Sequence, residues 1–174
     1  MLVTIWMTYI IEMVMLSMFG ILLVHAALED HKYKRVRRYI WYISGMIGGV
    51  LYSMNAFTAC GQMGIIIHRQ YKREWELLAE LICFGLLQLR LFSKMYGRAD
   101  SYAFICCSMV LSAFGDGMLV YLVHMLVAVV LLGAMQLAYG NVGKDGNLKI
   151  PVAFVPYIVV SFFICIFARN VLVA

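Results

Sequence analysis

Long apolar stretches alternate along the chain with short segments that are charged or rich in glycine. Each stretch has the length of a helix, and the strict apolar/polar alternation that marks membrane strands is absent. The six stretches cover residues 2–28, 39–67, 77–92, 101–115, 118–139 and 151–168. The pattern therefore predicts six helices joined by short connections, organised as a single domain over residues 1–174.

Composition indicates that these helices cross a membrane. Of the 174 residues, 64% are hydrophobic and 13% are charged, whereas soluble domains have about 45–50% apolar and about 25% charged residues. A span needs about 20 apolar residues to cross about 30 Å of hydrocarbon, so the chain has room for about six spans. We therefore expect an all-α integral membrane protein, a bundle of about six transmembrane helices in the cell membrane. Any chemistry must then lie on the helices or at their ends.

Basic residues are distributed unevenly among the connections. With six spans, residues 29–38, 93–100 and 140–150 lie on one side of the membrane. Nine of the lysines and arginines outside the spans lie in these connections and four lie on the other side. The nine are Lys32, Lys34, Arg35, Arg37, Arg38, Lys94, Arg98, Lys144 and Lys149. The positive-inside rule then predicts that these three connections are cytoplasmic and that both termini are outside.

Two aspartates stand at helix ends on the predicted cytoplasmic side. Asp30 follows the first apolar stretch and Asp100 precedes the fourth, which ends near Asp116. The 16 positions from Asp100 to Asp116 span only about 24 Å as a helix, less than the hydrocarbon thickness. Asp100 is therefore drawn towards the hydrocarbon, where an ionisable side chain is costly and marks a candidate functional site. A second carboxylate beside it would share a proton with it, and such a pair can activate water for peptide hydrolysis.

Structural roles for the same residues stay open at this point. Asp100 with Ser101 could cap the fourth helix, since both residue types are favoured caps. Asp30 could pair with Lys34 or Arg37 in a solvated basic loop. The functional alternative is a non-catalytic six-helix membrane protein, such as a small transporter subunit or an assembly partner.

Cysteines and histidines give no metal signal. The five cysteines lie in or beside apolar stretches without CxxC spacing, which argues against a zinc site or a disulfide framework. His25, one turn before Asp30, and His124 are expected to be packed, hydrogen-bonded histidines. We expect no cofactor and no metal.

Three segments resemble sequence motifs of the type IV prepilin peptidases. Asp30–Arg38, followed by the apolar Tyr39–Val50, resembles the first aspartate motif, in which an aspartate at a helix end precedes a basic stretch. Val36 matches that motif, and Arg37 and Arg38 stand where the family usually has Pro-Asn.

The other two segments follow in the family's order. Gly97–Asp100 resembles the GxGD motif, with Ala99 in place of its second glycine and Tyr102 in place of a common lysine. Lys149–Pro156 resembles the proline-containing start of the last helix, with wider spacing between the prolines. The three motifs together extend over nearly the whole chain.

The resemblance implies an intramembrane aspartyl endopeptidase with Asp30 and Asp100 as its catalytic pair. It also implies that the small residues Gly97 and Ala99 let a substrate strand approach the backbone. The substrates implied are pilin-like precursors with a short polar leader, a glycine before the cut and an apolar helix after it. The chain is similar to the short, peptidase-only form, so neither zinc nor a methyltransferase activity is expected. The expected partners are these precursors and membrane lipids, and no nucleic acid.

Overall fold

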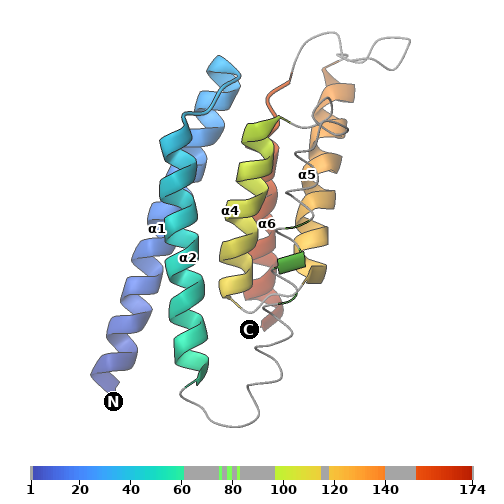
Figure 1. Cartoon of the computed structure of the whole chain (residues 1–174). Helices are drawn as coiled ribbons and strands as arrows, with labels where there is room; N and C mark the ends of the chain where they lie inside the picture. The colour runs from blue at the N-terminus through green and yellow to red at the C-terminus, as the bar shows by residue number, and fades with distance from the viewer. Residues whose placement is uncertain are drawn as a thin grey trace.

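The computed structural model describes residues 2–60, 75, 78–79, 82, 97–114, 118–139 and 152–173. Within these residues the regular structure is entirely helical (Figure 1). The helices are α1 (Leu2–Tyr33), α2 (Arg38–Cys60), α4 (Arg98–Ala113), α5 (Met118–Ala138) and α6 (Val155–Val173). The prediction of an all-α protein is therefore confirmed for this part of the chain.

Parts of the predicted organisation lie outside the described residues. The third predicted helix, 77–92, is described only at residues 78–79 and 82, which are helical. The connection 140–150, Asp116 and residues 93–96 of the third connection are likewise outside the described ranges.

The first helix is longer than predicted. The apolar pattern ends it at residue 28, but α1 continues through the charged residues to Tyr33. Hydropathy marks only the apolar part of a helix, and none of the residues that follow is a helix breaker. The residue after the helix, Lys34, has a left-handed φ of 54°, and its N–H donates to the Asp30 carbonyl at 2.9 Å. This left-handed C-cap leaves only residues 34–37 to connect α1 to α2.

The last helix begins later than its apolar pattern. The prediction places its start at residue 151, whereas α6 starts at Val155. The Phe154 carbonyl accepts the N–H groups of Tyr157 and Ile158 at 3.0 and 3.3 Å, which makes Phe154 the N-cap. Pro156 is then in the first turn, where its missing N–H removes no intrahelical hydrogen bond.

The helices pack through apolar side chains and small residues. α2 lies against α1 and α4, and α6 lies against α1, α4 and α5. Phe19 of α1 meets Phe162 of α6 edge to face, with ring centroids 5.5 Å apart. A Cβ on Gly48 of α2 would lie 3.2 Å from the Cβ of Met109 on α4. The close contact between α2 and α4 therefore depends on the absence of a side chain at Gly48.

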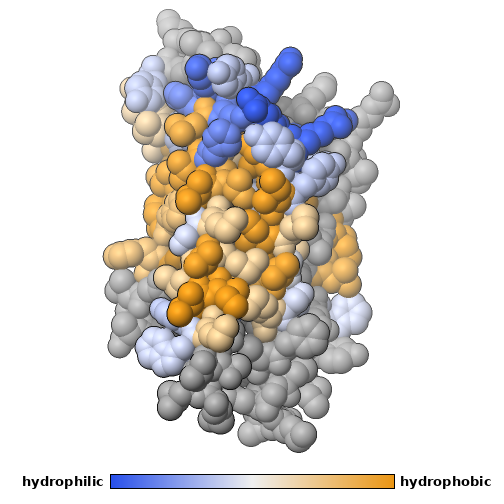
Figure 2. Space-filling view, turned by 90° about the vertical axis from the view of Figure 1, so that its left-hand side faces the viewer, coloured by the Kyte–Doolittle hydropathy of each residue, from blue (hydrophilic) through white to orange (hydrophobic). Residues whose placement is uncertain are grey.

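One end of the bundle is polar and basic. The end of α1 and the starts of α2, α4 and α6 meet there, at the top of Figure 1. Figure 2 shows the hydrophilic side chains of one face gathered at this end, above a broad apolar surface. Two helical segments, Tyr9–Tyr33 and Val120–Ala138, are long and apolar enough to cross a membrane, and Val155–Ala168 is a shorter apolar segment.

Candidate aspartate site

Asp30 lies in the last turn of α1 and is buried, with 6% of its surface exposed. Its Oδ2 accepts a 3.2 Å hydrogen bond from the backbone N–H of Val155, the first residue of α6. An N–H at this position has no acceptor within its own helix. The partial positive charge of a helix N-terminus also favours a carboxylate. Asp30 of α1 therefore caps α6.

Asp100 lies in the first turn of α4 and is half-buried. Its Oδ2 accepts a 2.9 Å hydrogen bond from the N–H of Gly97, the N-cap residue of that helix. A side chain three positions into a helix that binds back to the N-cap N–H forms half of a capping box. The alternative that Asp100 caps this helix is therefore confirmed, but from the third helical position, because the N-cap is Gly97 and neither Asp100 nor Ser101.

Gly97 matters for this contact because of its size. Its backbone is extended, with φ −70° and ψ 156°, so no left-handed conformation requires glycine. A Cβ built on Gly97 would lie 3.0 Å from Asp100 Oδ2. A side chain here would therefore press on the carboxylate that the Gly97 N–H holds.

The two aspartates interact electrostatically. The pKa of the Asp100 carboxyl is raised from 3.8 to about 6, first by burial and also by the negative charge of Asp30, against the opposing hydrogen bond from Gly97. The fold thus places two acids that are 70 positions apart in the sequence at the same end of the bundle. Burial is the main cause of the raised Asp100 pKa, and the charge of Asp30 contributes least.

Glu29, beside Asp30, has a different role, which sequence reasoning missed. Its Oε1 lies 3.1 Å from Nε of Arg37, and its Oε2 accepts the Arg37 backbone N–H at 3.1 Å. His25, one turn earlier, places Nε2 3.4 Å from the same carboxylate. The acid that pairs with Arg37 is therefore Glu29, and the alternative that Asp30 forms this pair is wrong. The spacing of His25 and Glu29 on one helix face was the available signal.

The two histidines differ in their surroundings. His124 of α5 is fully buried; its Nε2 lies 3.1 Å from the Ile158 carbonyl, and its ring meets Phe104 edge to face. It is thus a packed, hydrogen-bonded histidine, as predicted. His25 is half exposed and contacts Glu29 and not the aspartate pair, so the prediction of a packed residue is wrong for it.

Ala99 lines a groove between α2 and α4, whereas Gly97 contacts Asp100. The two small residues predicted to contact substrate therefore have different neighbours. The cysteines described with their side chains, Cys106, Cys107 and Cys165, are buried thiols. Within the described ranges, no three His, Cys, Asp or Glu residues are grouped so that they could hold a metal ion.

Comparisons with known proteins give no relative for this chain. No protein-family model matches it, and no curated protein and no solved structure matches it. The geometry of Asp30 and Asp100 at the helix ends is therefore the observation from which a function can be inferred.

Proposed function

We propose that this chain is an intramembrane aspartyl endopeptidase that removes the short leader from pilin-like precursors, with Asp30 and Asp100 as its catalytic pair. One observation carries the proposal. Two acids from helices distant in sequence lie at one end of the bundle, and the charge of Asp30 contributes to the raised pKa of Asp100. The resemblance of residues 30–38, 97–100 and 149–156 to prepilin-peptidase motifs supports the same pairing.

The pair suits acid and base catalysis. The ionised role falls to Asp30, because its carboxylate accepts the N–H at the N-terminus of α6, where a negative charge is favoured. Ionised Asp30 would take a proton from a water molecule, and the resulting hydroxide would attack the scissile carbonyl carbon. Protonated Asp100 would give its proton to the substrate as the C–N bond breaks. The water is incorporated into the products, and no metal or cofactor takes part.

The proposal places the bundle in the cell membrane as six transmembrane helices. Only 17% of the apolar window in α1 and 22% of that in α5 is buried within the chain, whereas a core helix of a soluble protein would be mostly covered. The apolar side chains of α1 exposed along its length include Ile21 and Leu28. The basic end would face the cytoplasm by the positive-inside rule, with residues 29–38, 93–100 and 140–150 inside and both termini outside.

This placement agrees with the proposed substrate. A precursor whose apolar helix lies in the bilayer presents its leader junction at the inner interface. Asp30 and Asp100 would meet the junction at that depth. Gly97 and Ala99 lie directly before Asp100 in the chain, and their small side chains would leave room for an extended substrate segment.

A second candidate is a non-catalytic membrane protein, such as a transporter subunit or an assembly partner. The observation that favours it is that each aspartate already accepts a helix-terminal N–H, from Val155 and from Gly97. In that reading the carboxylates stabilise helix ends and do no chemistry.

Co-expression separates the two candidates. The full chain would be expressed with a pilin-like precursor that carries a basic leader ending in glycine, and cleavage would be followed as a gel shift. We expect the precursor to be shortened by the wild type, and left intact by Asp30→Asn and by Asp100→Asn. Asp145→Asn, an aspartate outside the pair, serves as the matched control and should cleave normally. Cleavage by all three variants would remove the pair from catalysis.

A further inference from the structure

A groove of about 390 Å³ lies between α2 and α4, at the basic end of the bundle. Its wall includes Arg38 and Arg98, the first residues of the two helices, and Trp41, Tyr42 and Tyr102. Gly45 and Ile105, about one to two turns further along their helices, continue the wall into the apolar part of the bundle. The groove therefore passes from a cationic opening to an apolar interior.

The cations at the opening are available for a ligand. The side chains of Arg38 and Arg98 are exposed, and neither forms an ion pair within the described residues. Arg37 differs from these two arginines because its guanidinium is already bound to the Glu29 carboxylate. Two free guanidinium groups on facing helices can bind the oxygens of one phosphate with several charge-assisted hydrogen bonds.

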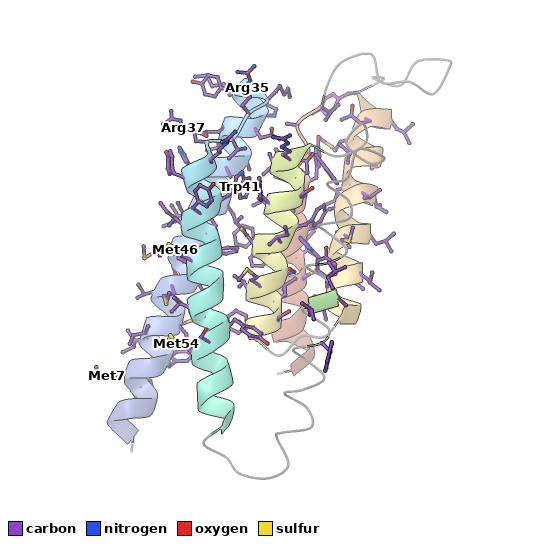
Figure 3. The ribbon with its side chains drawn as sticks, in the orientation of Figure 1. Met7, Arg35, Arg37, Trp41, Met46 and Met54 are labelled. Carbon is purple, nitrogen blue, oxygen red and sulfur yellow. The ribbon has the colours of Figure 1, made fainter. Side chains whose placement is uncertain are left out.

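Trp41 lines the groove, but its indole N–H is buried. Only 6% of this residue is exposed, and its indole Nε1 has no hydrogen-bond partner in the part of the chain that the structure describes. A buried donor without a partner costs about 1–3 kcal/mol. Figure 3 shows Trp41 on α2 a short way below Arg37 and above Met46. Because Nε1 is inaccessible, a ligand in the groove would contact the indole ring and not this N–H.

We propose that the α2–α4 groove binds an anionic phospholipid. Arg38 and Arg98 hold its phosphate, the Trp41 side chain packs beside it on the groove wall, and an acyl chain lies along Gly45 and Ile105. Tryptophan and tyrosine side chains are enriched at this depth of a membrane, and basic clusters attract anionic lipids. The inference rests on the membrane placement proposed above and does not depend on proteolysis.

The groove is basic at its opening and apolar further in, and this sequence of surfaces favours a lipid over a substrate segment. A lipid presents a negative head followed by an apolar tail, which matches the cationic opening and the apolar interior. The basic leader of a pilin-like precursor carries the same sign of charge as the two arginines, which would repel it. Asp30 and Asp100 do not line the groove, although Ala99, proposed above to face the substrate, is part of its wall.

Native mass spectrometry of the purified full chain tests the proposal. The chain would be titrated with phosphatidylglycerol and with phosphatidylcholine of the same acyl chains. We expect the anionic lipid to bind more tightly. Arg38→Gln and Arg98→Gln should each weaken its binding about tenfold, as expected for loss of a charge-assisted hydrogen bond. Trp41→Phe, which keeps an aromatic ring on the groove wall and loses only the buried N–H, should leave it nearly unchanged.

Matched controls decide the outcome. Arg35→Gln changes an exposed arginine of the same connection that does not line the groove, and it should leave lipid binding unchanged. Asp30→Asn should also bind the lipid normally, so loss of proteolysis and loss of lipid binding are distinguishable. Equal binding of the two lipids, or an equal effect of Arg35→Gln and Arg98→Gln, would overturn the proposal. So would displacement of the lipid by inorganic phosphate alone, or by the precursor's apolar segment.

Discussion

The backbone N–H of Val155 donates a 3.2 Å hydrogen bond to Oδ2 of Asp30, 125 positions earlier in the chain. This bond joins the end of α1 to the start of α6 inside the bundle. Asp30 consequently has two separable properties: it accepts a helix-terminal N–H, and it carries an ionisable proton. An asparagine keeps an acceptor oxygen in nearly the same place, whereas an alanine removes it.

Asp30→Ala should therefore destabilise the fold more than Asp30→Asn. Loss of the acceptor leaves the Val155 N–H buried and unpaired, which should lower the free energy of unfolding by about 1–2 kcal/mol. Thermal unfolding in detergent, followed by circular dichroism, measures the difference. Equal midpoints for the two variants would contradict a capping role. Both variants should be inactive in precursor cleavage, because neither can hold the proton.

Stability and activity should depend on pH through Asp100. Its folded-state pKa of about 6 lies above the ordinary value of 3.8. The folded state therefore binds this proton more tightly than the unfolded chain does. This contribution to stability is fully present below about pH 4 and is lost as the pH rises through about 6. Unfolding midpoints of the wild type should accordingly fall relative to those of Asp100→Asn between about pH 4 and pH 7.

The cleavage rate should fall over the upper part of that range, as Asp100 loses the proton it would donate. An initial-rate profile on a precursor in detergent measures this. A constant difference in midpoint between wild type and Asp100→Asn at every pH would show that the pKa of Asp100 is not raised.

Gly97→Ala should displace the Asp100 carboxylate. The added methyl group would start 3.0 Å from Oδ2, so the carboxylate must move by a few tenths of an ångström. A small misplacement of a catalytic group costs up to about 100-fold in rate. We expect a fall in cleavage rate with little change in expression. Ala99→Gly, a matched change two positions away that adds no atoms, should keep wild-type activity.

Substitutions of Glu29 and Arg37 should have coupled effects on the free energy of unfolding. The carboxylate is buried and binds both the guanidinium and the backbone N–H of Arg37, so it fixes the turn between α1 and α2. Glu29→Gln should lower the free energy of unfolding by about 1 kcal/mol, a modest figure because the Arg37 side chain is 68% exposed. A double-mutant cycle with Arg37→Gln measures the coupling. Arg35→Gln replaces Arg37→Gln in the control cycle, which should give additive effects.

Opposite ends of α1 should lie on opposite sides of the membrane. On a background without native cysteines, Lys34→Cys should react with a membrane-impermeant thiol reagent only after the cytoplasmic side is opened. Trp6→Cys, near the other end of the helix, should react in intact cells. The positive-inside rule gives this orientation from the basic residues at the Lys34 end. Labelling of both positions from one side would contradict a span between them.

The helices themselves were predictable because they depend on local chemistry. Met118–Ala138 matches the predicted 118–139 within a residue, since an unbroken apolar stretch has few alternatives to a helix. The ends were less predictable. Glu29–Tyr33 is helical because charged residues extend a helix readily, and hydropathy does not register that. The start of α6 depends on which carbonyl becomes the N-cap, and two prolines in the segment leave more than one choice.

By itself, the sequence determined that Asp30 and Asp100 stand at helix ends, on the same side of a bundle of helices joined by short connections. Asp100 binds the N–H of Gly97 at the start of its own helix, a local contact, whereas the partner of Asp30 depends on how distant helices pack. Successive residues on a helix point about 100° apart, so Glu29 and Asp30 face different neighbours. Packing of α1 against α6 turns Asp30 towards the Val155 N–H and leaves Glu29 to bind Arg37. That rotation depends on side chains more than a hundred positions away, such as Phe162 against Phe19.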